Sequence, residues 1–267
     1  MQDLSHFPKA CLFDVDRTLS DSKGEIRPVT RAALKKLAAA GYEIAVCTGR
    51  SYAELKQAIL PLFPDDSIHI TSGGAQVVRM SGEVVWEKVL PSELVHTIAE
   101  KVHALGADFG FSQRTLYAGT PNVLEYKRTQ RWPVETIDVY ELEDWTTPLL
   151  TIGSLNESVH AYMESLEDVE VKSMTNSLGM PYYDVTPIGI TKREGAQAWA
   201  KAVGVDLAET AAFGDSENDL EVLEYVGTGV AMGNAIPELK AIADFTIEDT
   251  DDDGIAQFVD HLLAQNT

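Results

Sequence analysis

The sequence predicts an α/β protein with a parallel-sheet core at residues 1–86 and 188–267, interrupted by an inserted α+β domain at residues 87–187. Three observations lead to this fold class. Apolar strand patterns alternate with helical patterns over about the first eighty residues, and the alternation returns after the insert, which is typical of parallel strands joined by right-handed crossovers. The segment between them mixes helices with short aromatic strands and has no such rhythm. With 267 residues, the chain is long enough for two domains.

The elements before the insert are predicted from apolar runs and from the proline and glycine residues that begin or end them. Pro28 suits the first turn of a helix, and Gly41 stops that helix as a left-handed cap would. Ser81-Gly82 separates two alternating runs and indicates a hairpin. The expected elements are a strand at 10–13, a helix at 28–37, a strand at 42–47, a helix at 52–60, a strand at 67–71 and a hairpin at 75–86.

The insert and the second half of the core follow by the same reasoning. Within the insert, the patterns predict helices at 92–105 and 157–166 and strands at 115–117 and 169–174. After the insert, strand and helix patterns alternate again to the end of the chain. The expected elements are helices at 192–203, 218–225, 237–243 and 255–263, with strands at 210–213, 229–232 and 245–246.

Charge and cysteine content limit the function classes. The formal net charge is −21, and such a surface repels nucleic acids and anionic membranes, so neither is expected as a partner. A site for an anionic small molecule must therefore supply its own positive charge. No apolar run reaches the 18 or more residues that a membrane-spanning helix needs. Cys11 and Cys47 lie in strand-like runs and are expected as buried free thiols, which suits a reducing cytoplasm.

Reactive side chains follow the predicted strands or open the predicted helices at four places. In open parallel sheets, ligands bind at the edge formed by the carboxyl ends of the strands. Taken alone, each place is also compatible with an ordinary turn or a solvated first helical turn. The four places are Asp14 with Asp16, Thr48 with Gly49, Lys192, and the run from Asp215 to Asp219.

The run Asp215-Ser216-Glu217-Asn218-Asp219 points to a metal ion. Three acidic residues at the end of a buried strand repel one another, and a bound divalent cation removes that cost. Mg²⁺ prefers a few carboxylates together with water and a phosphate. Lys192 adds a positive charge that can neutralise phosphate.

In this order, the four places resemble the motifs of the haloacid dehalogenase-like hydrolase superfamily. The run 215–219, the late insertion before Lys192 and the segment 230–235 are similar to its Cof-like sugar-phosphatase branch, which carries a large α/β cap between the second and third motifs. The resemblance implies a Rossmann-like core with an inserted cap domain. It also implies a cytoplasmic Mg²⁺-dependent phosphatase of small phosphorylated metabolites, with sugar phosphates as the expected substrates.

The resemblance also implies a role for each motif residue. Asp14 would be the nucleophile that forms an aspartyl-phosphate, and Asp16 the general acid and base. The phosphate would be bound by Thr48, Gly49, Lys192 and Asn218. The metal would be held by Asp14, the Asp16 carbonyl oxygen and Asp215, with Asp219 in a supporting position.

Asp16 also discriminates within the superfamily. Dehalogenase members lack this second aspartate, because a halide leaving group needs no proton, whereas the alkoxide of a phosphate ester does. Two further hypotheses stay open: a phosphohexomutase-like phosphotransferase, and a non-catalytic protein that binds phosphorylated metabolites. The chain departs from the family at Arg17, where glycine is usual, and at Gly73-Gly74-Ala75, where Asn-Gly-Ala is common. Arg17 is a candidate for substrate specificity.

A basic stretch of the cap stands out against the acidic composition. It contains Arg114, Lys127, Arg128 and Arg131, with Glu125 as the only acid between Phe109 and Val134. These residues are either a solvated face or a surface that attracts an anionic substrate. The second interpretation predicts that they contribute to substrate specificity.

Overall fold

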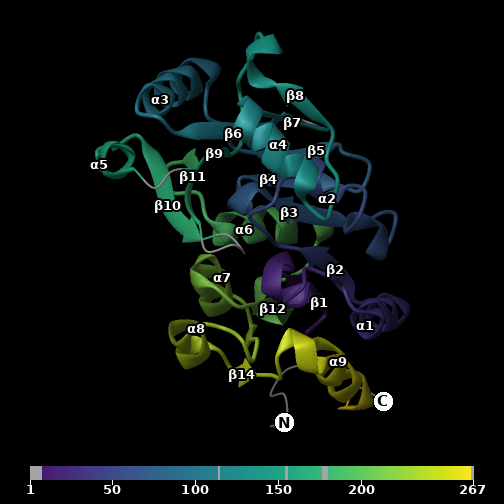
Figure 1. Cartoon of the computed structure of the whole chain (residues 1–267). Coiled ribbons are helices and arrows are strands. Elements are labelled where there is room, and N and C mark those ends of the chain that lie inside the picture. The colour runs from purple at the N-terminus through teal and green to yellow at the C-terminus, as the bar shows by residue number, and fades with distance from the viewer. Residues whose placement is uncertain (1–7, 114, 154–155, 176–179, 266–267) are drawn as a thin grey trace. The chain divides into compact units, whose positions relative to one another are not determined.

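The computed structural model describes residues 8–113, 115–153, 156–175 and 180–265. The chain forms two compact units (Figure 1). The first unit consists of the residues up to 49, residues 59–85 and the residues from 191 onward, and the second unit consists of residues 50–58 and 86–190. The segment 50–58, which the sequence analysis assigns to the core, therefore folds with the second unit.

As predicted, the first unit is built on a parallel sheet. It has five strands in the order β14-β13-β12-β1-β2. Between β1 and β12 the chain changes the direction in which it adds strands, and such a switch point is where open α/β sheets bind ligands. The strands are β1 (Ala10–Phe13), β2 (Glu43–Val46), β12 (Thr210–Gly214), β13 (Thr228–Ala231) and β14 (Phe245–Thr246).

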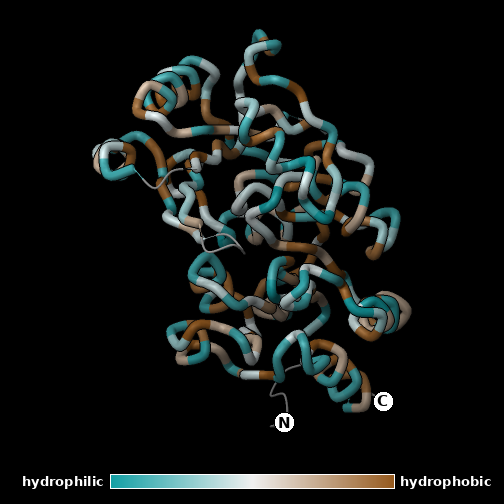
Figure 2. Tube along the Cα trace, in the orientation of Figure 1, coloured by the Kyte–Doolittle hydropathy of each residue, from teal (hydrophilic) through white to brown (hydrophobic). Residues whose placement is uncertain are grey.

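Helices cover both faces of this sheet (Figure 1). Helix α1 contacts α9 on one face, and α6 contacts α7 on the other. In α9, hydrophobic and hydrophilic residues alternate around the axis, and Phe258, Val259 and Leu262 are buried (Figure 2). The helices are α1 (Pro28–Ala39), α6 (Lys192–Val203), α7 (Leu220–Tyr225), α8 (Pro237–Ile242) and α9 (Gly254–Gln265).

A three-stranded sheet follows β2 along the chain. It consists of β3 (Ile68–Thr71), β4 (Gln76–Arg79) and β5 (Val84–Glu87), in that order. Gly82 has a φ of 88°, which fits the predicted turn between β4 and β5. The helix predicted at 52–60 is shorter than expected: α2 spans only Tyr52–Leu55. Residues 56–59 form turns, and Leu60–Leu62 form a short 3-10 helix that contains Pro61.

The second unit contains a six-stranded sheet in the order β10-β11-β9-β6-β7-β8, antiparallel except between β7 and β8. Its core is built around Phe109, Phe111 and Trp145. The strands are β6 (Asp108–Gln113), β7 (Leu116–Gly119), β8 (Thr136–Asp138), β9 (Leu150–Gly153), β10 (Val169–Thr175) and β11 (Pro181–Pro187). The helices are α3 (Ser92–Ala104), α4 (Pro121–Thr129) and α5 (Glu157–Glu164).

Helix α4 and strands β6, β8, β9 and β11 are absent from the elements that the sequence analysis predicts. Helix α4 buries only Leu124, so its apolar periodicity is weak. Among the described residues, no helix has the length and apolar character that crossing a membrane requires.

Candidate active site

Two aspartates meet at the switch point because β1 and β12 are paired in register. Phe13 pairs with Phe213 across the two strands, and their rings stack with centroids 4.7 Å apart. Asp14 is the next residue after Phe13, and its N–H donates to the Phe213 carbonyl oxygen at 2.9 Å. Asp215 follows β12 at the same edge. The parallel register therefore brings both carboxylates to one place.

The loop after Asp14 folds back on itself and contacts Asp215. Arg17 has a φ of 63°, a left-handed conformation that glycine adopts without strain, and its side chain is exposed. Its N–H donates to Ser20 Oγ at 3.2 Å. The Thr18 hydroxyl donates to Asp215 Oδ1 at 3.4 Å. Arg17 thus lies beside the carboxylates, at the one position of the first motif where the chain departs from the family.

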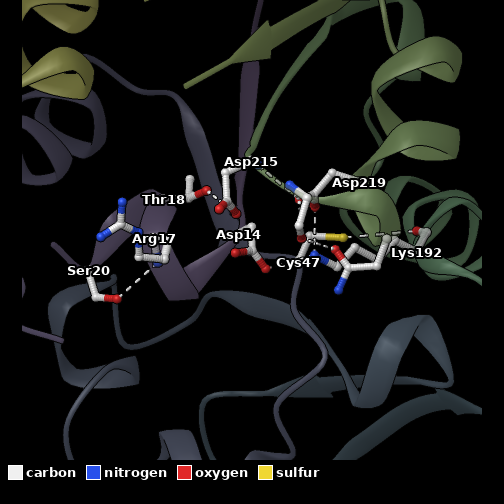
Figure 3. A network of polar contacts seen from close by, with 10 residues as sticks. Asp14, Arg17, Thr18, Ser20, Cys47, Lys192, Asp215 and Asp219 are labelled. Carbon is white, nitrogen blue, oxygen red and sulfur yellow. Dashed lines mark hydrogen bonds and ion pairs between the residues drawn. The ribbon is translucent and has the colours of Figure 1, made fainter. Parts of the chain in front are cut away.

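Lys192 is the buried cation of the site (Figure 3). It is the first residue of α6, and its side chain is only 1% exposed. Its Nζ donates to Asp14 Oδ1 at 2.7 Å and to Asp219 Oδ1 at 2.6 Å. Burial acts to lower the pKa of Lys192, but the charges of Asp14 and Asp219 raise it above its usual value. The ammonium group therefore stays charged and links the ends of β1 and β12.

Both carboxylate oxygens of Asp219 are occupied by protein groups. While Oδ1 accepts from Lys192, Oδ2 accepts the N–H groups of Asp215 at 3.0 Å and Ser216 at 3.1 Å. Gly214 makes this arrangement possible, because a Cβ at that position would lie 2.4 Å from Asp219 Cγ. Asp219 therefore orients Lys192 and the 215–216 backbone.

The carboxylates of Asp14 and Asp215 suit a divalent cation. Together with Asp219 they offer carboxylate oxygens that lie within 4.8 Å of one another. Burial raises the pKa of Asp14 to about 7 and that of Asp215 to about 8, and neighbouring carboxylates act in the same direction. A bound cation would reverse this shift, and oxygen ligands are those that hard cations prefer. Asp14, Asp215 and Asp219 are therefore the group of described residues that could hold a metal ion.

The remaining motif residues of the first unit follow the strands β1, β2 and β12. Asp16 is exposed, and its charge contributes to the raised pKa of Asp14. Thr48 is buried after β2, and its N–H donates to the Ile70 carbonyl oxygen at 3.1 Å. Gly49 is half-buried at the end of the first-unit segment. Asn218 is half-buried, and its Oδ1 accepts from Ser216 Oγ at 3.0 Å.

Asn234 also contacts the site, although the sequence analysis assigns no role to it. Its side-chain amide donates to the Arg17 carbonyl oxygen at 2.9 Å and to Asp215 Oδ2 at 3.4 Å. Its position in the sequence could have indicated this contact. Asn234 follows β13, which lies next to β12 in the sheet, so it is near the edge where Asp215 lies. Asn234 holds the loop after β1 against Asp215.

The basic stretch of the second unit is not a uniform set of exposed charges. Lys127 Nζ lies 2.5 Å from Glu54 Oε1, and both side chains are mostly buried, at 16% and 12% exposed. Burial acts to raise the pKa of Glu54, but Lys127 and Arg50 lower it to about 2. Lys127 therefore joins α4 to α2. Arg128 and Arg131 are exposed, and Arg114 lies outside the described residues.

The chain is similar to known proteins along most of its length. The chain matches the family of haloacid dehalogenase-like hydrolases over residues 11–259. It is 32% identical to the "Putative phosphatase YkrA" of Bacillus subtilis over 262 residues, which cover 95% of this chain and 97% of that protein. It is 28% identical to the HMP-PP phosphatase of Yersinia pseudotuberculosis over 242 residues, 85% of each chain.

A solved structure extends the comparison to the fold. A sugar phosphatase of subclass IIB of the same superfamily superposes with a TM-score of 0.77 at 28% sequence identity. The match covers 94% of this chain and 98% of that one. The chain therefore belongs to the haloacid dehalogenase-like hydrolase family.

Proposed function

We propose that the protein is a Mg²⁺-dependent phosphatase that hydrolyses small phosphorylated metabolites through an aspartyl-phosphate. The observation that carries the proposal is the group of Asp14, Lys192, Asp215 and Asp219 at the switch point. Phosphoryl transfer is mostly positioning and charge neutralisation, and this group offers a nucleophile, a buried cation and carboxylate oxygens within 4.8 Å of one another.

In the first step, a carboxylate oxygen of Asp14 attacks phosphorus and the ester oxygen leaves. Asp16 gives its proton to that oxygen, so the product departs as an alcohol. In the second step, Asp16 takes a proton from water, the water oxygen attacks the aspartyl-phosphate, and inorganic phosphate leaves with Asp14 restored. Lys192 and Asn218 offset the negative charge during both steps, while Thr48 and the Gly49 amide hold phosphoryl oxygens.

Asp14, the Asp16 carbonyl oxygen and Asp215 would hold the magnesium ion. When bound, the ion supplies charge stabilisation for the phosphoryl oxygens. Asp219 keeps its place by binding Lys192 and the backbone amides.

Removal of the metal is expected to abolish activity. With p-nitrophenyl phosphate as substrate, a chelator should remove turnover and added Mg²⁺ should restore it. Asp215→Asn keeps the shape of the side chain but loses its charge, so it should raise the Mg²⁺ concentration for half-maximal rate at least tenfold. Calorimetric titration with Mg²⁺ gives a second readout. Full turnover in chelator, with no metal found by elemental analysis, would contradict the assignment.

For the substrate, we propose sugar phosphates and related metabolites. The likeness to a subclass IIB sugar phosphatase supports sugar phosphates. The likeness to an HMP-PP phosphatase supports including other phosphorylated metabolites. Arg17, with its exposed side chain beside the carboxylates, is proposed to contact an anionic part of the substrate. A screen of phosphorylated metabolites for released phosphate tests the class. We also propose a cytoplasmic location, which the two buried free thiols support.

Arg128 is expected to act on substrate capture. Its charge is exposed in a protein of net charge −21, whereas Lys127 is paired with Glu54. Arg128→Gln should lower kcat/KM about two- to fivefold at low salt with little change in kcat, because uniform binding is lost. The effect should shrink near 0.15 M salt, where exposed charges are screened beyond ~8 Å.

Lys101→Gln, an exposed charge on α3 of the same unit, is the matched control. Steady-state kinetics at both salt concentrations decide between the two interpretations of the basic stretch. An equal effect of the two variants would mean that Arg128 belongs to a solvated face.

A further inference from the structure

The turn after β3 has an unusual backbone. Ser72, Gly73 and Gly74 have φ values of 54°, 66° and 99°, so three successive residues are left-handed. Serine rarely adopts this conformation, and such outliers persist only where the surroundings determine them. The Ser72 side chain is 1% exposed, and its hydroxyl has no hydrogen-bond partner among the described residues. The turn is therefore held by its neighbours rather than by local preference.

On one side, the turn is tied to the phosphate-binding residues proposed above. The Gly73 N–H donates to the Thr48 carbonyl oxygen at 3.0 Å. The Thr48 N–H in turn donates to the Ile70 carbonyl oxygen, two residues before the turn. The backbone of Thr48 is thus fixed both to β3 and to the turn that follows it.

On the other side, the turn packs against the first turn of α6. A Cβ on Gly74 would lie 2.0 Å from the Thr191 carbonyl oxygen and 2.8 Å from the Lys192 nitrogen. A Cβ on Gly195 would lie 2.8 Å from both Gly74 Cα and the Gly74 carbonyl oxygen. Only glycine at both positions lets the backbone of α6 come this close to the turn.

We infer that Gly74 and Gly195 are positioning residues that set the place of Lys192 relative to Thr48. The inference rests on the proposed function, in which Lys192 and Thr48 act on the same phosphoryl group. A side chain at either glycine pushes α6 away from the turn. Lys192 Nζ then leaves hydrogen-bond distance of Asp14 and Asp219, although every reactive group is still present. A misplacement of about 1 Å in a catalytic group can cost ~10²-fold in rate.

Gly195→Ala is the sharpest test, because helix propensity and packing predict opposite results. Alanine is the better helix former, so helix propensity alone predicts a more stable protein with unchanged turnover. The positioning role predicts that kcat for p-nitrophenyl phosphate falls at least tenfold while KM changes less than threefold. A crystal structure of the variant should show Lys192 Nζ more than 3.5 Å from at least one of Asp14 and Asp219.

A pair of variants separates the effect of a steric collision with α6 from the effect of a side chain at a positive φ. Gly74→Ala introduces both, whereas Gly41→Ala places a side chain at a φ of 86° with nothing within 4 Å. Both variants should melt at lower temperature, but only Gly74→Ala should lose turnover, at least a hundredfold.

The two proposals fail in distinguishable ways. If Gly195→Ala keeps its kcat within twofold, or keeps both Lys192 hydrogen bonds in its crystal structure, the positioning role is wrong. If the wild-type protein releases no phosphate from any ester, the proposed function is wrong. The crystal structure of Gly195→Ala still decides in that case whether the two glycines place Lys192.

Discussion

Asp14→Asn should lower kcat by at least about 10³-fold while the protein stays folded. The neutral amide has nearly the same shape as the carboxylate. Its oxygen can still accept a hydrogen bond from Lys192 Nζ, which lies 2.7 Å from Asp14 Oδ1 in the wild-type protein. It cannot act as a nucleophile toward phosphorus. Initial rates with p-nitrophenyl phosphate at saturating Mg²⁺, together with a thermal melt, give both quantities.

Asp66→Asn is the control for this experiment, because it removes the same charge from an exposed turn. It should leave kcat within twofold of the wild-type value. Acid quenching during turnover should trap a phosphorylated wild-type chain and no phosphorylated Asp14→Asn chain. More than a tenth of wild-type activity in Asp14→Asn would overturn the covalent mechanism.

Lys192→Met should remove activity and also destabilise the fold. The substitution leaves the buried carboxylates of Asp14 and Asp219 without their cation, and breaking a buried ion pair in this way costs about 3–5 kcal/mol. Lys201→Met, on the exposed side of the same helix, should change neither property. Urea unfolding and initial rates measure the two effects.

The pH dependence of Lys192→Met gives a further check. Burial already raises the pKa of Asp14 to about 7 although Lys192 acts against it, so loss of Lys192 should raise that pKa further. A group whose folded-state pKa is raised stabilises the fold below its unfolded pKa, and that stabilisation is lost as pH rises through the folded pKa. Relative to wild type, the variant should therefore be less destabilised at pH 5 than at pH 8. An equal stability loss at both values would contradict the burial argument.

The carboxylates and Lys192 could be located from sequence because their geometry depends on local order. Asp14 and Asp215 directly follow apolar strands, and parallel pairing places such residues at one edge of a sheet. The contribution of Asn234 needed the structure, because its contact with Arg17 joins residues far apart in the chain. The ion pair between Lys127 and Glu54 could not be predicted from the sequence either. An apolar pattern shows which face of a helix is buried but not which charge lies opposite it.

The burial of the two free cysteines affects how the enzyme responds to oxidants and thiol reagents. Burial raises the pKa of both Cys11 and Cys47 to about 12, and Cys47 Sγ lies 4.0 Å from the carbonyl oxygen of Lys192. Oxidants and alkylating reagents react with thiolates, and these thiols stay protonated and covered in the native state. Such reagents can reach Cys47 only when the end of β2 opens. Inactivation by a thiol reagent therefore requires local opening first, so the native fold protects the catalytic centre from thiol oxidation in proportion to the stability of this strand end.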